Sequence, residues 1–298
     1  MQIKLLGHLS ARLNHRSVVP SAAKQRQILA LLALTPGQVV TVARLFEELW
    51  GDNPPRSAPT TLQTYILQLR GKLTKALTEE DKQDGRTAKD ILVTRHGGYS
   101  LAIEPECVDV HEFRQLARAG RTAFDAGDDR AASAYFGRAL ELWHGEALMD
   151  LPLGRVLELE ANSLEQTRLG LLGRRIEADL RLGRHTELLG ELLTLVARNP
   201  MHESLSAQLM TALYRSGHTA RALETFQQLR STLISALGVE PAPWVRRLHQ
   251  AILVGDPALD PPVARRGAAA QDGGMASAGA GAPSPARSAR ELAGYAAV

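Results

Sequence analysis

The chain has 298 residues, 44% of them hydrophobic, and a formal net charge of +3 at pH 7, so it is long enough for two or three modest domains with hydrophobic cores. Its single cysteine, Cys107, excludes an internal disulfide framework and a cysteine-based zinc finger. Because no apolar run approaches the roughly 18 residues that span a bilayer, and the first residues do not resemble a signal peptide, we expect a cytoplasmic protein.

Positive charge is concentrated toward the amino end. Residues 1–103 hold 14 Lys and Arg against 8 Asp and Glu, a net charge of +6, whereas residues 104–255 hold 17 against 20. All six lysines lie at or before Lys89. Localised positive charge is typical of a domain that binds a polyanion.

The first 55 residues predict a small strand-rich cap followed by two helices. The apolar runs at 3–6, 9–13 and 18–19 indicate short strands. Helical spacing then covers 24–34 and 42–50, and each helix is followed by Gly or Pro residues that stop it.

A third, longer helix is predicted between Ser57 and Leu77. Leu62, Ile66, Leu69 and Leu73 follow the spacing of a buried stripe, with Ser57 as a plausible N-cap and a proline in the first turn.

The opposite face of this helix carries hydroxyl, amide and cationic side chains, which suit a DNA major groove. An ordinary solvated helix face is the alternative interpretation. For base edges or sugars we expect Thr60, Thr61, Thr64 and Gln68, and for phosphates Ser57, Lys72 and Lys75. Lys24 and Arg26, at the start of the first long helix, either add phosphate contacts or are solvated cations. Leu67 lies on the polar face, where it meets a thymine methyl, meets a neighbouring protomer, or is a stray surface leucine.

Residues 78–90 predict a polar loop, and the strand-like runs 91–94 and 99–103 predict a hairpin. A hairpin after a recognition helix is a wing. Arg95 and His96 at its tip are candidates for contacts to the minor groove or to phosphates.

Residues 105–254 predict helices throughout. Their expected bounds are 110–126, 130–143, 153–182, 185–198, 202–216, 219–237 and 242–254. Gly183 and Gly217 stand between helix pairs and are 34 residues apart, the tetratricopeptide period. Stacked helix pairs leave a concave surface that usually holds another protein, although an inert bundle that only dimerises the chain is the alternative.

From Gly255 onward Ala, Gly, Pro and Ser dominate, which predicts a disordered tail over 255–298. The sequence contains no catalytic constellation, no phosphate loop and no metal-ligand spacing among its nine histidines, so we expect neither an enzyme nor a cofactor or metal site. Trp143 and His144 are interpreted as a packed helix end rather than a ligand site.

Three ordered segments resemble the Streptomyces antibiotic regulatory proteins: LWGDNPP at 49–55, TTLQTYI at 60–66 and GGY at 97–99. The resemblance covers about residues 1 to 253 and is nearest to the activators of aromatic polyketide antibiotic clusters. It implies a mostly α protein with an OmpR-type winged helix-turn-helix domain (1–104), an all-α, tetratricopeptide-like bacterial transcriptional activation domain (105–254) and the tail. Gly71 departs from the basic residue that such relatives often carry there.

The resemblance also implies a function: a transcriptional activator of an antibiotic biosynthesis cluster. Its expected partners are double-stranded DNA, as direct repeats near promoters, RNA polymerase holoenzyme, and a second copy of itself on DNA, with no membrane partner and a location at the nucleoid. The alternative function is a protein-interaction adaptor in which the helical repeats bind a partner and the winged domain is only a scaffold.

Overall fold

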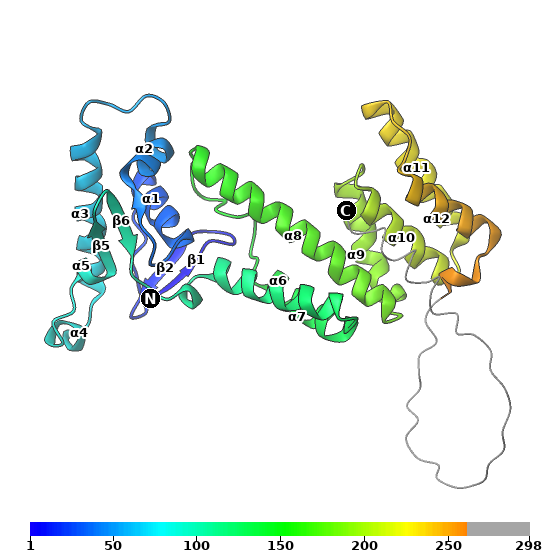
Figure 1. The fold of residues 1–298 in the computed structure, drawn as a ribbon, viewed down its shortest axis with the longest axis horizontal. Helices are drawn as coiled ribbons and strands as arrows, with labels where there is room; N and C mark the ends of the chain where they lie inside the picture. The colour runs from blue at the N-terminus through cyan, green and yellow to red at the C-terminus, as the bar shows by residue number, and fades with distance from the viewer. Residues whose placement is uncertain (261–298) are drawn as a thin grey trace, which may run out of the picture. The chain divides into compact units, whose positions relative to one another are not determined.

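A computed structural model describes residues 1–260, so the expectation for 261–298 lies outside the described residues. The chain is mostly helical, with two small sheets near its amino end (Figure 1). It divides into two compact units. Unit 1 comprises residues 1–125 and 134–172, and unit 2 comprises 126–133 and the described residues from 173 onward.

The first sheet is an antiparallel cap of strands β1 (Gln2–Lys4), β2 (Ser10–Leu13) and β3 (Arg16–Ser17). Ile3 pairs with Ala11, and both side chains are buried, which gives the cap one apolar face. The third strand precedes the expected residues 18–19, although the Val18 N–H still donates to the Ala11 carbonyl at 2.9 Å.

The three expected helices form with nearly the expected bounds: α1 (Ala23–Leu34), α2 (Val42–Trp50) and α3 (Ala58–Ala76). The predicted stripe on α3 is buried, with Leu62, Ile66, Leu69 and Leu73 all less than 5% exposed. Burial of this stripe leaves the polar face of α3 outside the core.

The second sheet contains the predicted hairpin, β5 (Leu92–Arg95) and β6 (Gly98–Leu101), and a two-residue strand β4 (Val40–Thr41) that the sequence did not predict. Its order is β4-β6-β5, so β6 is central. At Gly98 an added Cβ would lie 2.2 Å from the Val40 carbonyl oxygen. Glycine at this position therefore permits the close approach of β4 to β6.

The expectation of a polar loop at 78–90 is wrong in part, because the segment is polar but partly helical. This segment contains two short helices, α4 (Glu79–Gln83) and α5 (Ala88–Ile91), each opened by a capping box. Thr78 pairs with Asp81, and Thr87 pairs with Asp90. These reciprocal hydrogen bonds satisfy amide groups that a short helix otherwise leaves unpaired.

The rest of the described chain is helical, as predicted, after a 3₁₀ turn η1 (Pro105–Cys107). The helices are α6 (Asp109–Asp125), α7 (Asp129–Glu141), α8 (Arg155–Arg181), α9 (His185–Arg198), α10 (Glu203–Arg215), α11 (Thr219–Leu237) and α12 (Pro243–Val254). Gly183 and Gly217 have φ angles of 80° and 79°, the left-handed conformation that ends one helix before the next begins.

The first residues assigned to the disordered tail are ordered. Residues Pro257–Leu259 form a 3₁₀ turn, η2, whose Leu259 side chain is buried. The Arg215 Nε donates to the Leu259 carbonyl at 2.8 Å and so attaches this turn to α10. No helix in the described part of the chain is long and apolar enough to cross a membrane.

Candidate nucleic-acid interface

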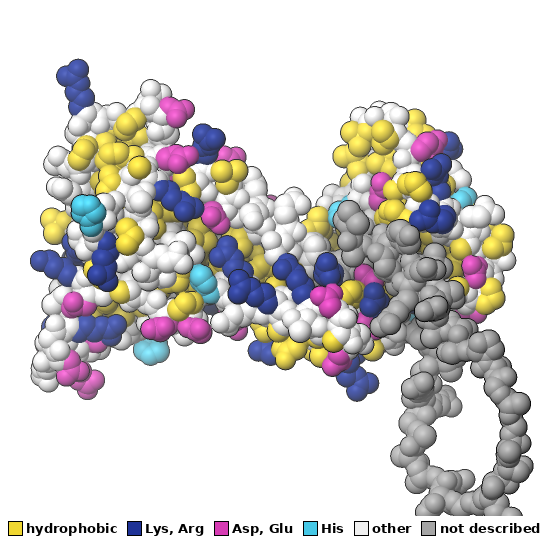
Figure 2. Space-filling model, viewed as in Figure 1, with side chains coloured by type: hydrophobic (Ala, Val, Ile, Leu, Met, Phe, Trp, Pro, Cys, Tyr) yellow, Lys and Arg dark blue, Asp and Glu magenta, His cyan; other side chains and the backbone are white. Residues whose placement is uncertain are grey.

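The exposed face of α3 carries the side chains that the sequence assigned to DNA. Ser57, Thr60, Thr64, Gln68 and Lys75 are exposed, and Thr61 and Lys72 are half-buried at the margins. The helix begins after Ser57, whose side chain makes no capping bond, so its hydroxyl is not engaged with the α3 amides. Basic side chains lie over the part of the molecule that contains α3 and the β5–β6 hairpin (Figure 2).

Internal hydrogen bonds define what two of these side chains can offer a base. The Thr64 hydroxyl donates to the Thr60 carbonyl at 3.0 Å, which leaves its oxygen as an acceptor. The Gln68 Oε1 accepts a hydrogen bond from Gln25 Nε2, which leaves the Gln68 amide N–H groups as donors. In this conformation, Thr64 suits an exocyclic amine and Gln68 suits a purine acceptor.

Gln25 is a positioning residue that the sequence analysis missed. It lies on α1, is only 8% exposed, and holds the Gln68 side chain in one orientation. The two residues are 43 positions apart, so no local pattern in the sequence links them.

The wing is attached firmly to the recognition helix. Arg70 of α3 donates from Nε and Nη2 to the Leu92 carbonyl, at 3.0 and 2.7 Å, and from Nη2 to the Thr94 hydroxyl at 2.8 Å. Arg95 and His96 are exposed at the hairpin tip, beside Gly97 with φ of 74°. The candidate groove-reading helix and the candidate wing contacts therefore belong to one rigid element pair.

Lys24 and Arg26 both make contacts within the protein. Lys24 Nζ donates to the Leu49 carbonyl at 3.0 Å and lies 4.7 Å from the centre of the Trp50 ring. Arg26 forms an ion pair with Asp150. Burial alone would raise the pKa of Asp150, but the Leu9 amide and the Arg26 guanidinium together hold it below its ordinary value. These contacts give both cations a structural role, and their assignment to phosphates stays a prediction.

Arg56 is a candidate that the sequence analysis omitted. It is exposed and lies one residue before the N-cap of α3, where backbone N–H groups also favour phosphate. Its position directly before Ser57 was the signal that could have identified it.

Three buried or partly buried acids join the winged-helix elements to the first helices of the activation region within unit 1. Glu48 accepts hydrogen bonds from the Gly154 and Leu157 amides at 2.7 and 2.9 Å. Burial raises its pKa, although these amides and Gln27 oppose the shift. Because the carboxylate satisfies amides at the start of α8, it acts as a cap supplied by α2.

Glu48 accepts from amides later in the chain, whereas Asp109 and Asp150 accept from amides near the amino end. Asp109 accepts from the Leu5 and Leu6 amides at 2.9 and 3.0 Å, and burial raises its pKa. Asp150 accepts from the Leu9 amide at 2.8 Å. The strand cap at the amino end is consequently held by residues more than 100 positions away.

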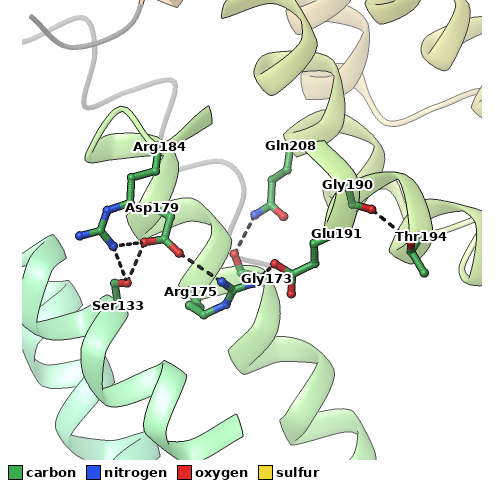
Figure 3. A network of polar contacts seen from close by, with 9 residues as sticks. All are labelled: Ser133, Gly173, Arg175, Asp179, Arg184, Gly190, Glu191, Thr194 and Gln208. Atoms are coloured by element: carbon green, nitrogen blue, oxygen red, sulfur yellow. Dashed lines mark hydrogen bonds and ion pairs between the residues drawn. The ribbon is translucent and has the colours of Figure 1, made fainter. Parts of the chain in front are cut away.

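In unit 2 a polar network connects α7, α8 and α9 (Figure 3). Asp179, which is 5% exposed, accepts from the Ser133 hydroxyl at 2.7 Å and from the guanidinium groups of Arg184 and Arg175 at 2.8 and 3.3 Å. Arg175 also pairs with Glu191. Every charge in this network has a partner, so its role is to hold helices together.

Trp143 is a packed helix end, as expected. Its ring lies edge-to-face with Phe113 at 5.3 Å between centroids, and the Arg168 guanidinium lies 4.6 Å from the ring. Among residues 1–260, no group of three His, Cys, Asp or Glu side chains is arranged to hold a metal ion.

An OmpR-like order of sheet, three helices and wing, followed by tetratricopeptide-like helices, defines the class of winged helix-turn-helix transcriptional regulators. Residues 16–101 match the family "Transcriptional regulatory protein, C terminal", and residues 108–253 match the "Bacterial transcriptional activator domain". The chain therefore belongs to the Streptomyces antibiotic regulatory protein family of transcriptional activators, and both matched domains are regulatory rather than catalytic.

Individual relatives agree with this assignment. The chain is 51% identical over 260 residues to Regulatory protein DnrI of Streptomyces peucetius, a match that covers 87% of this chain and 94% of that protein. It is 35% identical to Transcriptional regulator RedD of Streptomyces coelicolor, over 89% of this chain and 73% of RedD. It spans only 25% of the length of Regulatory protein AfsR from the same species, at 35% identity over 87% of this chain.

A solved structure has the same fold. Mycobacterium tuberculosis EmbR, in complex with a low affinity phosphopeptide, superposes with a TM-score of 0.78 and 31% sequence identity. The match covers 86% of this chain and 65% of EmbR.

Proposed function

We propose that this activator binds short direct repeats near the promoters of an antibiotic biosynthesis cluster and recruits RNA polymerase holoenzyme there. The observation that carries the proposal is the exposed polar face of α3, locked by Arg70 to a hairpin with a basic tip. Helix α3 lies in the major groove, where Thr60, Thr61, Thr64 and Gln68 contact bases or sugars.

The remaining contacts position the protein on the duplex and do not read the base sequence. Ser57, Lys72 and Lys75 on α3 bind phosphates, and Arg95 and His96 reach the adjacent minor groove or its phosphates. Two protomers dock head to tail, because direct repeats require a heterologous arrangement whereas a two-fold dimer requires inverted repeats. The helical activation region supplies the contacts for self-association and for polymerase.

A footprint of the full chain on promoter fragments near its own gene, repeated at several salt concentrations, tests this proposal. Protection of repeats spaced by one helical turn is expected. If each protomer neutralises about three phosphates, affinity of a pair falls on the order of 10³-fold between about 50 and 200 mM salt. Inverted repeats would refute head-to-tail docking, and absence of discrete protection would favour the adaptor function.

Variants separate base contacts from phosphate contacts. Thr64→Ala with Gln68→Ala is expected to reduce binding to the protected site but to change binding to unrelated DNA little. Arg95→Ala is expected to weaken binding to both DNAs similarly and to reduce the slope of log affinity against log salt by about 1. Arg130→Ala, at an exposed position on α7, is the matched control and is expected to leave both affinities unchanged. Equal losses on both DNAs for the α3 pair would contradict the assigned base contacts.

A further inference from the structure

Leu67 is an exposed apolar side chain in the middle of the polar face of α3. It is 70% exposed, the largest value among the exposed large hydrophobic side chains of the described residues. It lies three residues after Thr64 and four before Gly71, so all three share one helix face. A leucine so exposed adds little to the core, so its side chain is available to a ligand of this face.

The surroundings of Leu67 favour contact with a base over contact with protein. A stable protein interface buries about 800 Å² on each partner, and its centre is apolar. The exposed side chains that share this face with Leu67 are the hydroxyls of Thr60 and Thr64, the Gln68 amide and the cation Lys75, with no second exposed large apolar side chain on α3. Two such basic faces repel one another, whereas DNA attracts them.

Gly71 leaves room beside Leu67. An added Cβ at Gly71 would meet no atom within 4 Å, so one turn beyond Leu67 the surface of α3 is bare backbone. A base edge can approach the helix closely at this point. The apolar group that the major groove presents is the C5-methyl of thymine.

We propose that Leu67 contacts the C5-methyl group of one thymine in each DNA repeat and so contributes to sequence specificity. This inference rests on the proposed binding of α3 in the major groove. It adds an apolar contact to the polar contacts of Thr64 and Gln68 and predicts discrimination between thymine and uracil, which differ at this carbon only by the methyl group.

The test measures binding of the full chain to a fragment with a single repeat, in which each thymine is replaced in turn by uracil. At one position the wild-type affinity is expected to fall about fourfold, the loss that removal of one buried methyl-sized group predicts. The Leu67→Ala variant is expected to bind the thymine fragment correspondingly more weakly and to be insensitive to uracil at that position. Leu159→Ala, at a leucine on α8 that is 63% exposed, is the matched control and is expected to keep the wild-type sensitivity to uracil.

The outcomes distinguish this inference from the proposed function. No specific binding to any fragment would refute both. Specific binding with no uracil-sensitive position, or with equal uracil sensitivity in the Leu67→Ala variant, would refute the thymine contact alone. A Leu67→Ala effect that appears only on fragments with two repeats would instead assign Leu67 to a contact between protomers and would also overturn the inference.

Discussion

The Asp81 carboxylate of helix α4 shows how local hydrogen bonds control the ionisation of an acidic side chain. The Thr78 amide and hydroxyl donate to Asp81 at 3.0 and 2.9 Å, Asn14 donates at 2.7 Å, and these bonds lower the Asp81 pKa to about 2. A folded-state pKa below the ordinary 3.8 means that the ionised form stabilises the fold. This contribution is complete above pH 3.8 and is lost as the pH falls through about 2.

Replacement of Thr78 should therefore remove the main cause of the low Asp81 pKa. We expect Thr78→Ala to raise the Asp81 pKa toward 3.8, because both the side-chain bond and the ordered cap are lost. The measurement is a titration of the carboxyl carbon by NMR. Thr87→Ala, which removes the equivalent capping box with Asp90, serves as the control and should leave the Asp81 titration midpoint unchanged. An unchanged midpoint in Thr78→Ala would show that the Thr78 bonds do not control the charge.

At the scale of elements, replacement of two glycines by alanine is expected to change the stability of the fold in opposite directions. At Gly98 a methyl group would meet the Val40 carbonyl at 2.2 Å and Val39 Cγ1 at 2.9 Å, so Gly98→Ala should separate β4 from β6 and cost about 2 kcal/mol. At Gly71, inside α3, nothing lies within 4 Å, so Gly71→Ala should stabilise the helix by about 1 kcal/mol. Urea unfolding followed by circular dichroism measures both changes. A similar loss of stability in both variants would mean that close packing at Gly98 is not the cause.

The helices were largely predictable because their apolar periodicity is local. The buried stripe of α3 and the bounds of α2, α9 and α11 agree with the sequence analysis to the residue or nearly so. Helices α4 and α5 were missed because five and four residues are too few to show a period. Strand β4 was missed because a two-residue strand is defined by its partner β6, which lies far along the chain.

Part of the candidate site was predictable because it depends on local sequence pattern. The rest was missed because it depends on contacts between residues that are distant in sequence. The exposed face of α3 and the wing tip follow from local pattern. The engagement of Lys24 and Arg26 does not, because their partners are Leu49, Trp50 and Asp150, which are distant in sequence. Likewise, the control of Gln68 by Gln25 depends on how α1 packs near α3.

At the scale of the whole molecule, the contacts of Glu48, Asp109 and Asp150 predict how unit 1 unfolds. Trp50 lies among the winged-helix elements and Trp143 in the activation region, yet both belong to unit 1, whereas Trp244 belongs to unit 2. In variants that retain one tryptophan, we expect Trp50 and Trp143 to report the same urea midpoint, because the three acids join their surroundings into one cooperative unit.

A substitution at the junction sharpens this prediction. Glu48→Ala leaves the Gly154 and Leu157 amides without their acceptor and should lower the stability reported by both tryptophans by about 3 kcal/mol. Arg44→Ala is the control, since its ion pair with Glu160 at 3.3 Å is partly exposed and worth little. A Glu48→Ala shift seen by Trp50 but not by Trp143 would mean that the two regions unfold separately.

The same junction limits how this regulator can be recombined with its relatives. A hybrid joined at residue 104 keeps the Leu5 and Leu6 amides but takes the residue at position 109 from another parent, and it keeps Glu48 while replacing the amides of 154 and 157. For exchange of DNA specificity between family members we therefore expect stable hybrids where the incoming segment carries compatible acids and loops, or where the crossover is moved to about residue 172 within α8. The winged helix and the start of the activation region therefore form one exchangeable piece, and the boundary between the two matched families is not its edge.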